Sequence, residues 1–286
     1  MNYPLIIAIM IILITALILL SPLLPVPDPY SAYNIYWNGY SKAITICNAT
    51  VRYYGTNNAS VIMLIPMMKP SITLINELIN FTRSGGVLII ISNGEYYGNY
   101  ILRAMGINAE FSNSSIIDPI MNYVNPSFPI AVVSPTYQGI IGTQYLLLDN
   151  SSYIVLMGNE DAVIIAETSP FSEVNGVNGP FPVITKMPYG SGSVVLIASP
   201  SMFMNSMINY YGNSALLHWL CSGGNVVFLE GFIAKVTPLA ILRVYGHYAY
   251  TGLRTLWTKY LIVVLPIAIV IVIMIVDELR GGGNEE

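Results

Sequence analysis

Two similar stretches decide the fold of this chain: FTRSGGVLIIISNGE, from Phe81 to Glu95, and WLCSGGNVVFLEG, from Trp219 to Gly231. Each stretch passes from a helical pattern through Ser-Gly-Gly into a short apolar run that stops at a carboxylate, Glu95 or Glu230. Paired glycines suit a helix C-terminus because only glycine adopts the left-handed conformation there at little cost. A continuous apolar run directly afterwards is typical of a strand that helices cover on both faces. The two stretches therefore predict helix-to-strand junctions within one α/β sheet.

The first half of the chain alternates between strand and helix patterns. SVIMLIP at 60–66 predicts a buried strand, and the following PSITLINELINFTRSGG predicts an amphipathic helix with Ser71 as its N-cap. A second short helix is expected to end at Gly106, and a short helix and a strand are expected before residue 55. This alternation predicts a parallel α/β sheet with right-handed crossovers.

The middle of the chain, from Ile130 to about Glu173, has a different pattern. Short apolar runs such as IAVVS, YLLLDN and AVIIAET are separated by turn residues and predict strands without helices. FPVITKMPYGSGSVVLIASP, at 181–200, predicts a hairpin whose turn lies between Pro188 and Gly192. The sequence thus predicts a β-rich extension of a mostly parallel sheet.

Both ends of the chain are strongly apolar. Of the 286 residues, 54% are apolar and 9% are charged, which is too hydrophobic for an ordinary soluble domain. No charged residue lies between Leu5 and Leu20, and a second apolar run, Leu261 to Val276, follows Trp257 and Tyr260. Runs of about 20 such residues span a bilayer as helices, and flanking aromatic residues suit its interface. We therefore expect two transmembrane helices, the lipid bilayer as a partner and the cell membrane as the location.

These runs divide the chain into five predicted parts. They are an N-terminal transmembrane anchor (1–25), an α/β domain (26–235), a juxtamembrane segment (236–259), a C-terminal transmembrane helix (260–277) and a flexible tail (278–286). A secretory signal is the alternative for the first part, but it lacks a basic n-region and a cleavage site. Positive-inside counting leans toward an internal domain, whereas five N-glycosylation acceptors favour an extracytoplasmic one. The acceptors are Asn48, Asn58, Asn80, Asn113 and Asn150.

Charge and composition exclude several classes of function. The chain has 15 acidic and 11 basic residues, and leaving out the four acids and Arg280 of the C-terminal end gives 11 against 10. Such a balanced domain has no basic face for nucleic acid. With only His218 and His247, a zinc site is not expected, and no metal or cofactor is predicted. Cys47 and Cys221 either form a disulfide in an external domain or remain buried free thiols.

Four stretches cover most of the chain from Asp28 to Gly231: DPYSAYNIYWNGYSKA, FTRSGGVLIIIS, SPFSEVNG with GPFPVITKMPYGSGSVVLIASPSMFMNSMI, and NSALLHWLCSGGNVVFLEG. Together they resemble the prokaryotic domain-of-unknown-function family 4350. The resemblance implies a flavodoxin-like sheet of the class I glutamine amidotransferase-like kind, in a domain between membrane spans. It also implies MoxR-type ATPases and von Willebrand factor A-like proteins as neighbours in an envelope complex.

The resemblance bears on catalysis as well. The amidotransferase-like fold carries its nucleophilic thiol in a Gly-x-Cys-x-Gly turn after a central strand, where this chain has Glu95 in SNGEYYG. Cys47 belongs to the opening segment and Cys221 precedes its strand, so neither replaces that thiol. His218 lies three residues before Cys221, which is the spacing of a Cys-His pair or of an unrelated histidine at a helix end. The chain is therefore not expected to be a Cys/His hydrolase.

The first group of candidate site residues lies where strands end. Ligands of open α/β sheets bind outside the carboxyl ends of the strands. Glu95 and Glu230 are thus candidate catalytic acids, as an acid/base pair or as cation ligands if they are adjacent. The alternative is that each acid caps a loop or lies in water. Asn93, Ser201 and Asn205 are candidate binding residues of the same region.

The second candidate site is the aromatic stretch YSAYNIYWNGY. Trp37 offers a face on which a sugar can stack, and Asn34 and Asn38 offer hydrogen bonds. Core packing is the alternative use of these rings. The sequence as a whole predicts a membrane-tethered, non-catalytic binding or scaffolding domain of a cell-envelope complex. Two alternatives remain open, namely a carboxylate-based or metal-assisted hydrolase and an extracytoplasmic carbohydrate-binding protein.

Overall fold

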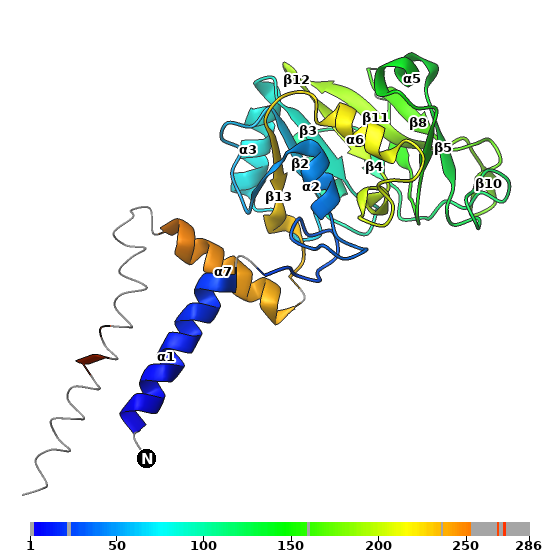
Figure 1. Ribbon diagram of the computed structural model, residues 1–286. Helices are drawn as coiled ribbons and strands as arrows, with labels where there is room; N and C mark the ends of the chain where they lie inside the picture. Colours follow the sequence, from blue (N-terminus) through cyan, green and yellow to red (C-terminus); the bar gives the residue numbers. More distant parts are fainter. Residues whose placement is uncertain are drawn as a thin grey trace, which may run out of the picture. The chain divides into compact units, whose positions relative to one another are not determined.

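The computed structural model describes residues 3–21, 24–158, 161–235, 237–252, 268 and 271–272. The chain divides into two compact units (Figure 1). The larger unit is Pro27–Ala234, and the smaller one consists of Met1–Val26 and Lys235–Glu286. The larger unit contains the sheet and all the candidate sites.

A nine-stranded mixed sheet forms the centre of the larger unit (Figure 1). Five neighbouring strands run parallel, in the order β1 (Thr50–Arg52), β13 (Val226–Leu229), β2 (Val61–Leu64), β3 (Val87–Ile91) and β12 (Gly192–Ile197). Antiparallel strands continue the sheet as β11 (Pro182–Tyr189), β8 (Val163–Glu167), β5 (Ile130–Val133) and β6 (Tyr145–Leu147). The apolar runs after both Ser-Gly-Gly phrases are strands β3 and β13, as predicted.

The strand order contradicts the predicted flavodoxin-like sheet. Numbered along the chain, the five parallel strands lie in the spatial order 1-5-2-3-4, whereas a flavodoxin-like sheet has the order 2-1-3-4-5. β13 lies between β1 and β2 because all its residues are buried, while the half-exposed β1 suits the sheet edge. Four strand pairs are parallel and four are antiparallel, so the prediction of a mostly parallel sheet was also wrong.

Helices cover both faces of the sheet (Figure 1). On one face, α2 (Ser41–Cys47) and α6 (Asn213–Leu220) join a core that includes Ile89 of β3. On the other face, α3 (Ile72–Arg83) and α4 (Gly98–Met105) join a core that includes Leu88. Successive side chains of a strand point to opposite faces, so a strand covered on both sides is apolar throughout.

Local signals act as predicted at most junctions of the larger unit. Ser71 Oγ accepts a hydrogen bond from the Leu74 N–H at 3.3 Å and so caps α3. Gly85 and Gly106 follow α3 and α4 with φ values of 106° and 72°, which are left-handed conformations. After α6 the left-handed residue is Gly224, with a φ of 118°, rather than the residue next to the helix C-cap. The two Ser-Gly-Gly phrases therefore use different glycines for the same reversal.

The middle of the chain is less regular than predicted. A helix, α5 (Pro135–Ile141), lies among the expected strands, with its proline in the first turn and Gly142 as its left-handed cap. β7 (Ile154–Leu156) leaves the main sheet and pairs with β4 (Ala109–Phe111), and β9 (Glu173–Val174) pairs with β10 (Val177–Asn178). The hairpin of β11 and β12 is confirmed, with Tyr189 opposite Gly192 at its turn. Two short 3₁₀ helices, η2 (Pro200–Phe203) and η3 (Glu230–Phe232), follow β12 and β13.

The smaller unit includes α1 (Tyr3–Leu20) and α7 (Pro238–Gly252), which contact each other. Among the residues that the structure describes, no helix has both the length and the apolarity needed to cross a membrane. The 18 residues of α1 extend for roughly 27 Å, less than a hydrocarbon core of about 30 Å. The predictions of an N-terminal transmembrane span and of a location in the membrane through two spans were therefore wrong. The second expected span, 260–277, and the tail lie almost entirely outside the described residues.

A disulfide joins Cys47 and Cys221, whose Cα atoms lie 5.3 Å apart. Cys47 is the last residue of α2 and Cys221 is the C-cap of α6, so the bond links two helices on one face of the sheet. Of the two alternatives that the sequence left open, the disulfide is therefore the one that forms. The two cysteines are 174 residues apart in the sequence, so their proximity could not be predicted from it and arises only in the folded sheet.

Candidate functional site

The carboxyl ends of the parallel strands contact residues 27–40, which we call the N-terminal loop. Glu230, directly after β13, is 1% exposed and accepts hydrogen bonds from two residues of this loop. Ser31 Oγ donates to Oε1 at 2.6 Å, and the Ala32 N–H donates to Oε2 at 3.0 Å. Hydrogen bonds to an ionised carboxylate are stronger than neutral ones. Glu230 therefore fastens the N-terminal loop to the sheet.

Asn205 holds the other half of the N-terminal loop. Its Nδ2 donates to the carbonyl oxygens of Asn34 at 3.0 Å and Tyr36 at 2.7 Å. Its backbone N–H donates to the carbonyl of Gly39 at 2.8 Å. Within the loop, Asn34 Nδ2 donates to Asn38 Oδ1 at 2.9 Å. These three asparagines, all sequence candidates for binding a ligand, use their side chains to shape the chain itself.

Two tyrosines of the N-terminal loop, Tyr30 and Tyr40, pack together with Tyr96. The ring centroid of Tyr30 lies 5.8 Å from that of Tyr40 and 6.3 Å from that of Tyr96, and Tyr40 Oη donates to the carbonyl of Pro200. Burial, reinforced by the neighbouring phenols, raises the pKa of Tyr40 well above its usual value, and burial also raises the pKa of Tyr96. Tyr40 and Tyr96 thus stay neutral, and together with Tyr30 they fill the region where an open α/β sheet binds ligands.

The structure does not bring Glu95 and Glu230 together. Strand β2 lies between β3 and β13, so the two strand ends are about 10 Å apart. Glu95 is exposed and accepts a hydrogen bond from Asn93 Nδ2 at 3.4 Å. Asn93 Oδ1 is buried and has no hydrogen-bond partner within the described residues. Glu95 and Glu230 therefore do not form an acid/base pair.

Two further chemistries lack a geometric basis. Across the described residues, no group of three or more His, Cys, Asp or Glu side chains is placed to hold a metal ion. His218 is exposed on α6 and the sulfur of Cys221 is part of the disulfide, so the two do not form a catalytic pair.

All five acceptor asparagines for N-glycosylation are exposed, namely Asn48, Asn58, Asn80, Asn113 and Asn150. Their side chains are therefore accessible for modification.

An open cavity of about 340 Å³ is lined in part by the N-terminal loop, and we call it the aromatic cavity. Trp37 of the loop lines it together with Tyr123, Tyr210 and Phe128 from later segments. Trp37 is 70% exposed and Tyr210 is 40% exposed, although rings of this size are usually buried. The Tyr123 and Tyr210 rings lie 5.3 Å apart, and this closeness raises the pKa of Tyr123. The cavity therefore presents several aromatic faces to solvent.

The segment that carries Tyr123 is rigidly held. Asp118 is fully buried and its Oδ1 accepts from the N–H groups of Ile120 at 2.9 Å and Met121 at 2.7 Å. Beside Tyr123, Val124 has a φ of 70° and is 82% exposed. A β-branched residue in the left-handed region is strained, and such strain persists only where the surroundings enforce it. The aromatic cavity thus has a wall that is fixed before any ligand binds.

Asp149 supplies a carboxylate to the aromatic cavity. Burial raises the pKa of Asp149, and a hydrogen bond with the side chain of Ser201 acts in the opposite direction. Ser201, a sequence candidate, therefore contacts a residue of this cavity although it does not line the cavity itself. Sequence reasoning missed Asp149, Tyr123 and Tyr210, although an acid directly after the apolar run YLLL was a usable signal.

The fold and the site define a mixed α/β domain whose strand ends are filled by its own N-terminal loop and whose open cavity is aromatic. The chain belongs to the family described as Domain of unknown function (DUF4350), whose model matches residues 32–221. This match does not carry the amidotransferase-like fold that the resemblance implied. Among curated proteins, none matches the chain significantly.

Solved structures give only distant likenesses. The chain is similar to the mmIFT52 N-terminal domain, with 16% identity, 56% of this chain and 77% of that chain covered, and a TM-score of 0.46. It is also similar to a cytoplasmic protein from Salmonella typhimurium, with 13% identity, coverage of 63% and 77%, and a TM-score of 0.37. A third similar structure is the β-galactosidase from Bacillus circulans sp. alkalophilus, with 13% identity and a TM-score of 0.34. The match covers 54% of this chain and 22% of the enzyme, so the chain spans about a fifth of that enzyme. Because these TM-scores are below 0.5, the likenesses carry no argument about function.

Proposed function

We propose that the larger unit is a non-catalytic binding domain and that it binds carbohydrate in the aromatic cavity. One observation carries the proposal. The N-terminal loop fills the strand ends, where a ligand of such a sheet would bind, and contributes the exposed Trp37 to an open cavity. The loop that occupies one possible site thus contributes to another.

The chemistry of the cavity favours a sugar. A sugar ring has apolar C–H faces that pack on aromatic faces, and Trp37, Tyr123 and Tyr210 provide such faces. Its edge carries hydroxyl donors, for which the half-buried carboxylate of Asp149 is an acceptor. The cavity volume of about 340 Å³ lies within the range of small-molecule sites. The rigid wall at Val124 lowers the entropy that binding costs.

The test is titration of the full chain with cellobiose, maltotriose and diacetylchitobiose, followed by calorimetry. We expect saturable binding of at least one saccharide and a loss of at least tenfold in affinity for Trp37→Ala, since exposed aromatic anchors dominate such sites. Ile35→Ala is the matched control, because Ile35 belongs to the same loop and is 62% exposed but does not line the cavity. Its affinity is expected to stay within twofold of the unchanged protein.

Other outcomes would overturn the proposal. If no saccharide binds, or if the Ile35 and Trp37 variants weaken binding equally, the carbohydrate site is excluded. Preferential binding of tetramethylammonium in the same titration would instead identify the cavity as a cation cage of aromatic rings. A scaffold beside MoxR-type ATPases or von Willebrand factor A-like proteins stays a prediction, which copurification of such a partner in stoichiometric amount would test.

A further inference from the structure

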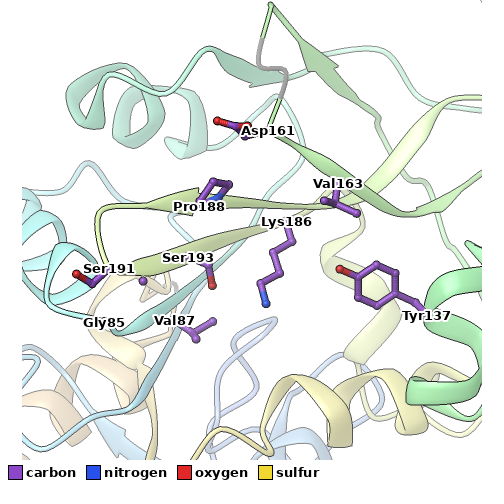
Figure 2. A pocket seen from close by; sticks show the side chains of 10 residues that line it. Gly85, Val87, Tyr137, Asp161, Val163, Lys186, Pro188, Ser191 and Ser193 are labelled. Carbon is purple, nitrogen blue, oxygen red and sulfur yellow. The ribbon is translucent and has the colours of Figure 1, made fainter.

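A second cavity, of about 400 Å³, lies at the amino ends of β3 and β12, and we call it the Lys186 pocket. Figure 2 shows the Lys186 side chain extending into it, with Val87, Ser193 and Tyr137 around the ammonium. Lys186 is directly opposite Val163 in the sheet, and Ser193 is opposite Val87. These side chains share one face because directly paired residues point the same way. A single lysine therefore stands on an otherwise apolar and hydroxylated face.

The Lys186 pocket is rich in hydrogen-bond donors that the protein does not use. Within the described residues, the ammonium of Lys186 forms neither a hydrogen bond nor an ion pair. The hydroxyls of Tyr137, Ser191 and Ser193 also lack partners in that part of the chain, although Ser193 is only 9% exposed. Ser191 is exposed and Lys186 and Tyr137 are half-buried, so solvent reaches these donors. Four side-chain donors around one cavity are therefore available to an acceptor from outside.

The carbonyl groups at the nearby C-terminus of α3 are not free to repel an anion in the Lys186 pocket. The C-terminus of α3 would repel an anion through its free carbonyl groups. Those carbonyls are already bonded: Phe81 O accepts from Gly86 N at 3.1 Å, and Arg83 O accepts from Ser191 N at 3.0 Å. Asp161 is exposed at the rim of the pocket, and Figure 2 shows it apart from the Lys186 ammonium.

We infer that the Lys186 pocket binds an oxyanion, the phosphate or carboxylate group of a small molecule. An ammonium accompanied by hydroxyl donors complements such a group, and charge-assisted hydrogen bonds of this kind are the strong ones. The cavity is large enough for more than the anionic group alone. This inference is independent of the carbohydrate proposal, because none of its residues lines the aromatic cavity.

Calorimetric titration of the full chain with inorganic phosphate and with malonate tests the inference and tells the two anions apart. We expect saturable binding of at least one anion, and a loss of at least tenfold in affinity for Lys186→Gln, because a charged hydrogen-bond donor is removed. Lys69→Gln is the matched control, since Lys69 is exposed, lies over the Tyr100 ring and does not line the Lys186 pocket. That variant is expected to bind with unchanged affinity.

Two further variants keep the inference testable if the Lys186→Gln protein does not fold. Ser193→Ala is expected to weaken binding several-fold, and Asp161→Asn is expected to strengthen it slightly at low salt by removing a rim charge. If neither anion binds saturably at concentrations up to about 10 millimolar, which is on the order of a weak small-ligand affinity, the inference is overturned. Equal weakening by Lys69→Gln and Lys186→Gln would overturn it as well, because that result is a general charge effect.

Discussion

At the scale of single residues, surroundings decide what a side chain does. Glu95 and Glu230 occupy similar places in two similar sequence phrases, each at the end of an apolar strand. Glu95 lies exposed, whereas Glu230 is buried and accepts hydrogen bonds from Ser31 and Ala32. The N-terminal loop, distant in sequence, makes this difference. Residue type and local pattern alone could not distinguish a solvated acid from an anchoring one.

Glu230→Gln is expected to lower the free energy of unfolding by about 1–3 kcal/mol, since an amide has one acceptor oxygen where the carboxylate has two. The Ser31 and Ala32 donors then compete for that single oxygen. Glu95→Gln, at the exposed position, is the control and should change stability by less than about 0.5 kcal/mol. Urea denaturation of both variants gives the comparison. Equal effects would show that the loop contact at Glu230 does not stabilise the fold.

Asp149 gives a prediction about pH. Because burial raises its pKa in the folded protein, the folded state binds this proton more tightly than the unfolded chain does. The charged carboxylate therefore lowers stability as pH rises above its unfolded pKa of about 3.9, and protonation relieves this cost at lower pH. Asp149→Asn should be more stable than the unchanged protein at pH 7, and the difference should vanish near pH 3. A constant difference at both values, measured by urea denaturation, would contradict the assignment.

At the scale of elements, the N-terminal loop is the part that defines the site. It has no regular secondary structure, yet Asn205 and Glu230 hold it against the strand ends. Its close path depends on Gly39, where an added Cβ would lie 1.9 Å from the carbonyl oxygen of Asn34. The helices α3 and α4, by contrast, follow from their own caps and apolar faces. Elements with local signals were predictable, whereas the contacts that hold the loop were not.

Gly39→Ala tests how tightly the loop is packed. The new methyl group would collide with backbone, so we expect a loss of at least about 2 kcal/mol in the free energy of unfolding. Gly139→Ala is the matched control, because Gly139 lies in α5 with nothing within 4 Å of its added Cβ. That substitution should be neutral or stabilising by up to about 1 kcal/mol. Thermal and urea unfolding of both variants measures the contrast, and a tolerated Gly39→Ala would disprove the close approach.

At the scale of the whole molecule, contacts between distant segments complete the larger unit. β13 enters the sheet between β1 and β2, and the disulfide of Cys47 and Cys221 lies on the adjoining face of helices. Together they close the end of the unit onto its beginning. Because β13 comes from the end of the unit and pairs with β1 and β2 at its beginning, the strand order differs from that of a flavodoxin-like sheet.

Replacement of both cysteines by serine is expected to destabilise the protein by about 2–5 kcal/mol, because a crosslink over 174 residues restricts the unfolded chain strongly. Urea denaturation with and without a reducing agent measures this effect. Reductant should weaken the unchanged protein and leave the Cys47→Ser, Cys221→Ser protein unaltered. A protein whose stability responds neither to reductant nor to the double substitution would contradict a stabilising disulfide.

Much of the fold could be predicted because its signals are local. Ser71, Gly85 and Gly106 mark helix ends by capping and left-handed glycine, and the apolar runs of β3 and β13 show burial on both faces. The candidate site was less predictable. Trp37 was identified, but Asp149, Tyr210 and Lys186 come from segments that only the fold brings to a cavity.

The helix-to-strand units, their caps and the hairpin of β11 and β12 follow from local sequence, because hydrogen bonds and backbone conformations within a few residues specify them. The strand order, the disulfide and the closure of the strand ends by the N-terminal loop depend on the folded chain, and its tertiary contacts set them. It also decided that Glu230 anchors a loop while Trp37 and Lys186 line open cavities. These features depend on contacts between residues far apart in the chain, and no local pattern records which distant partner will bury a side chain or leave it free.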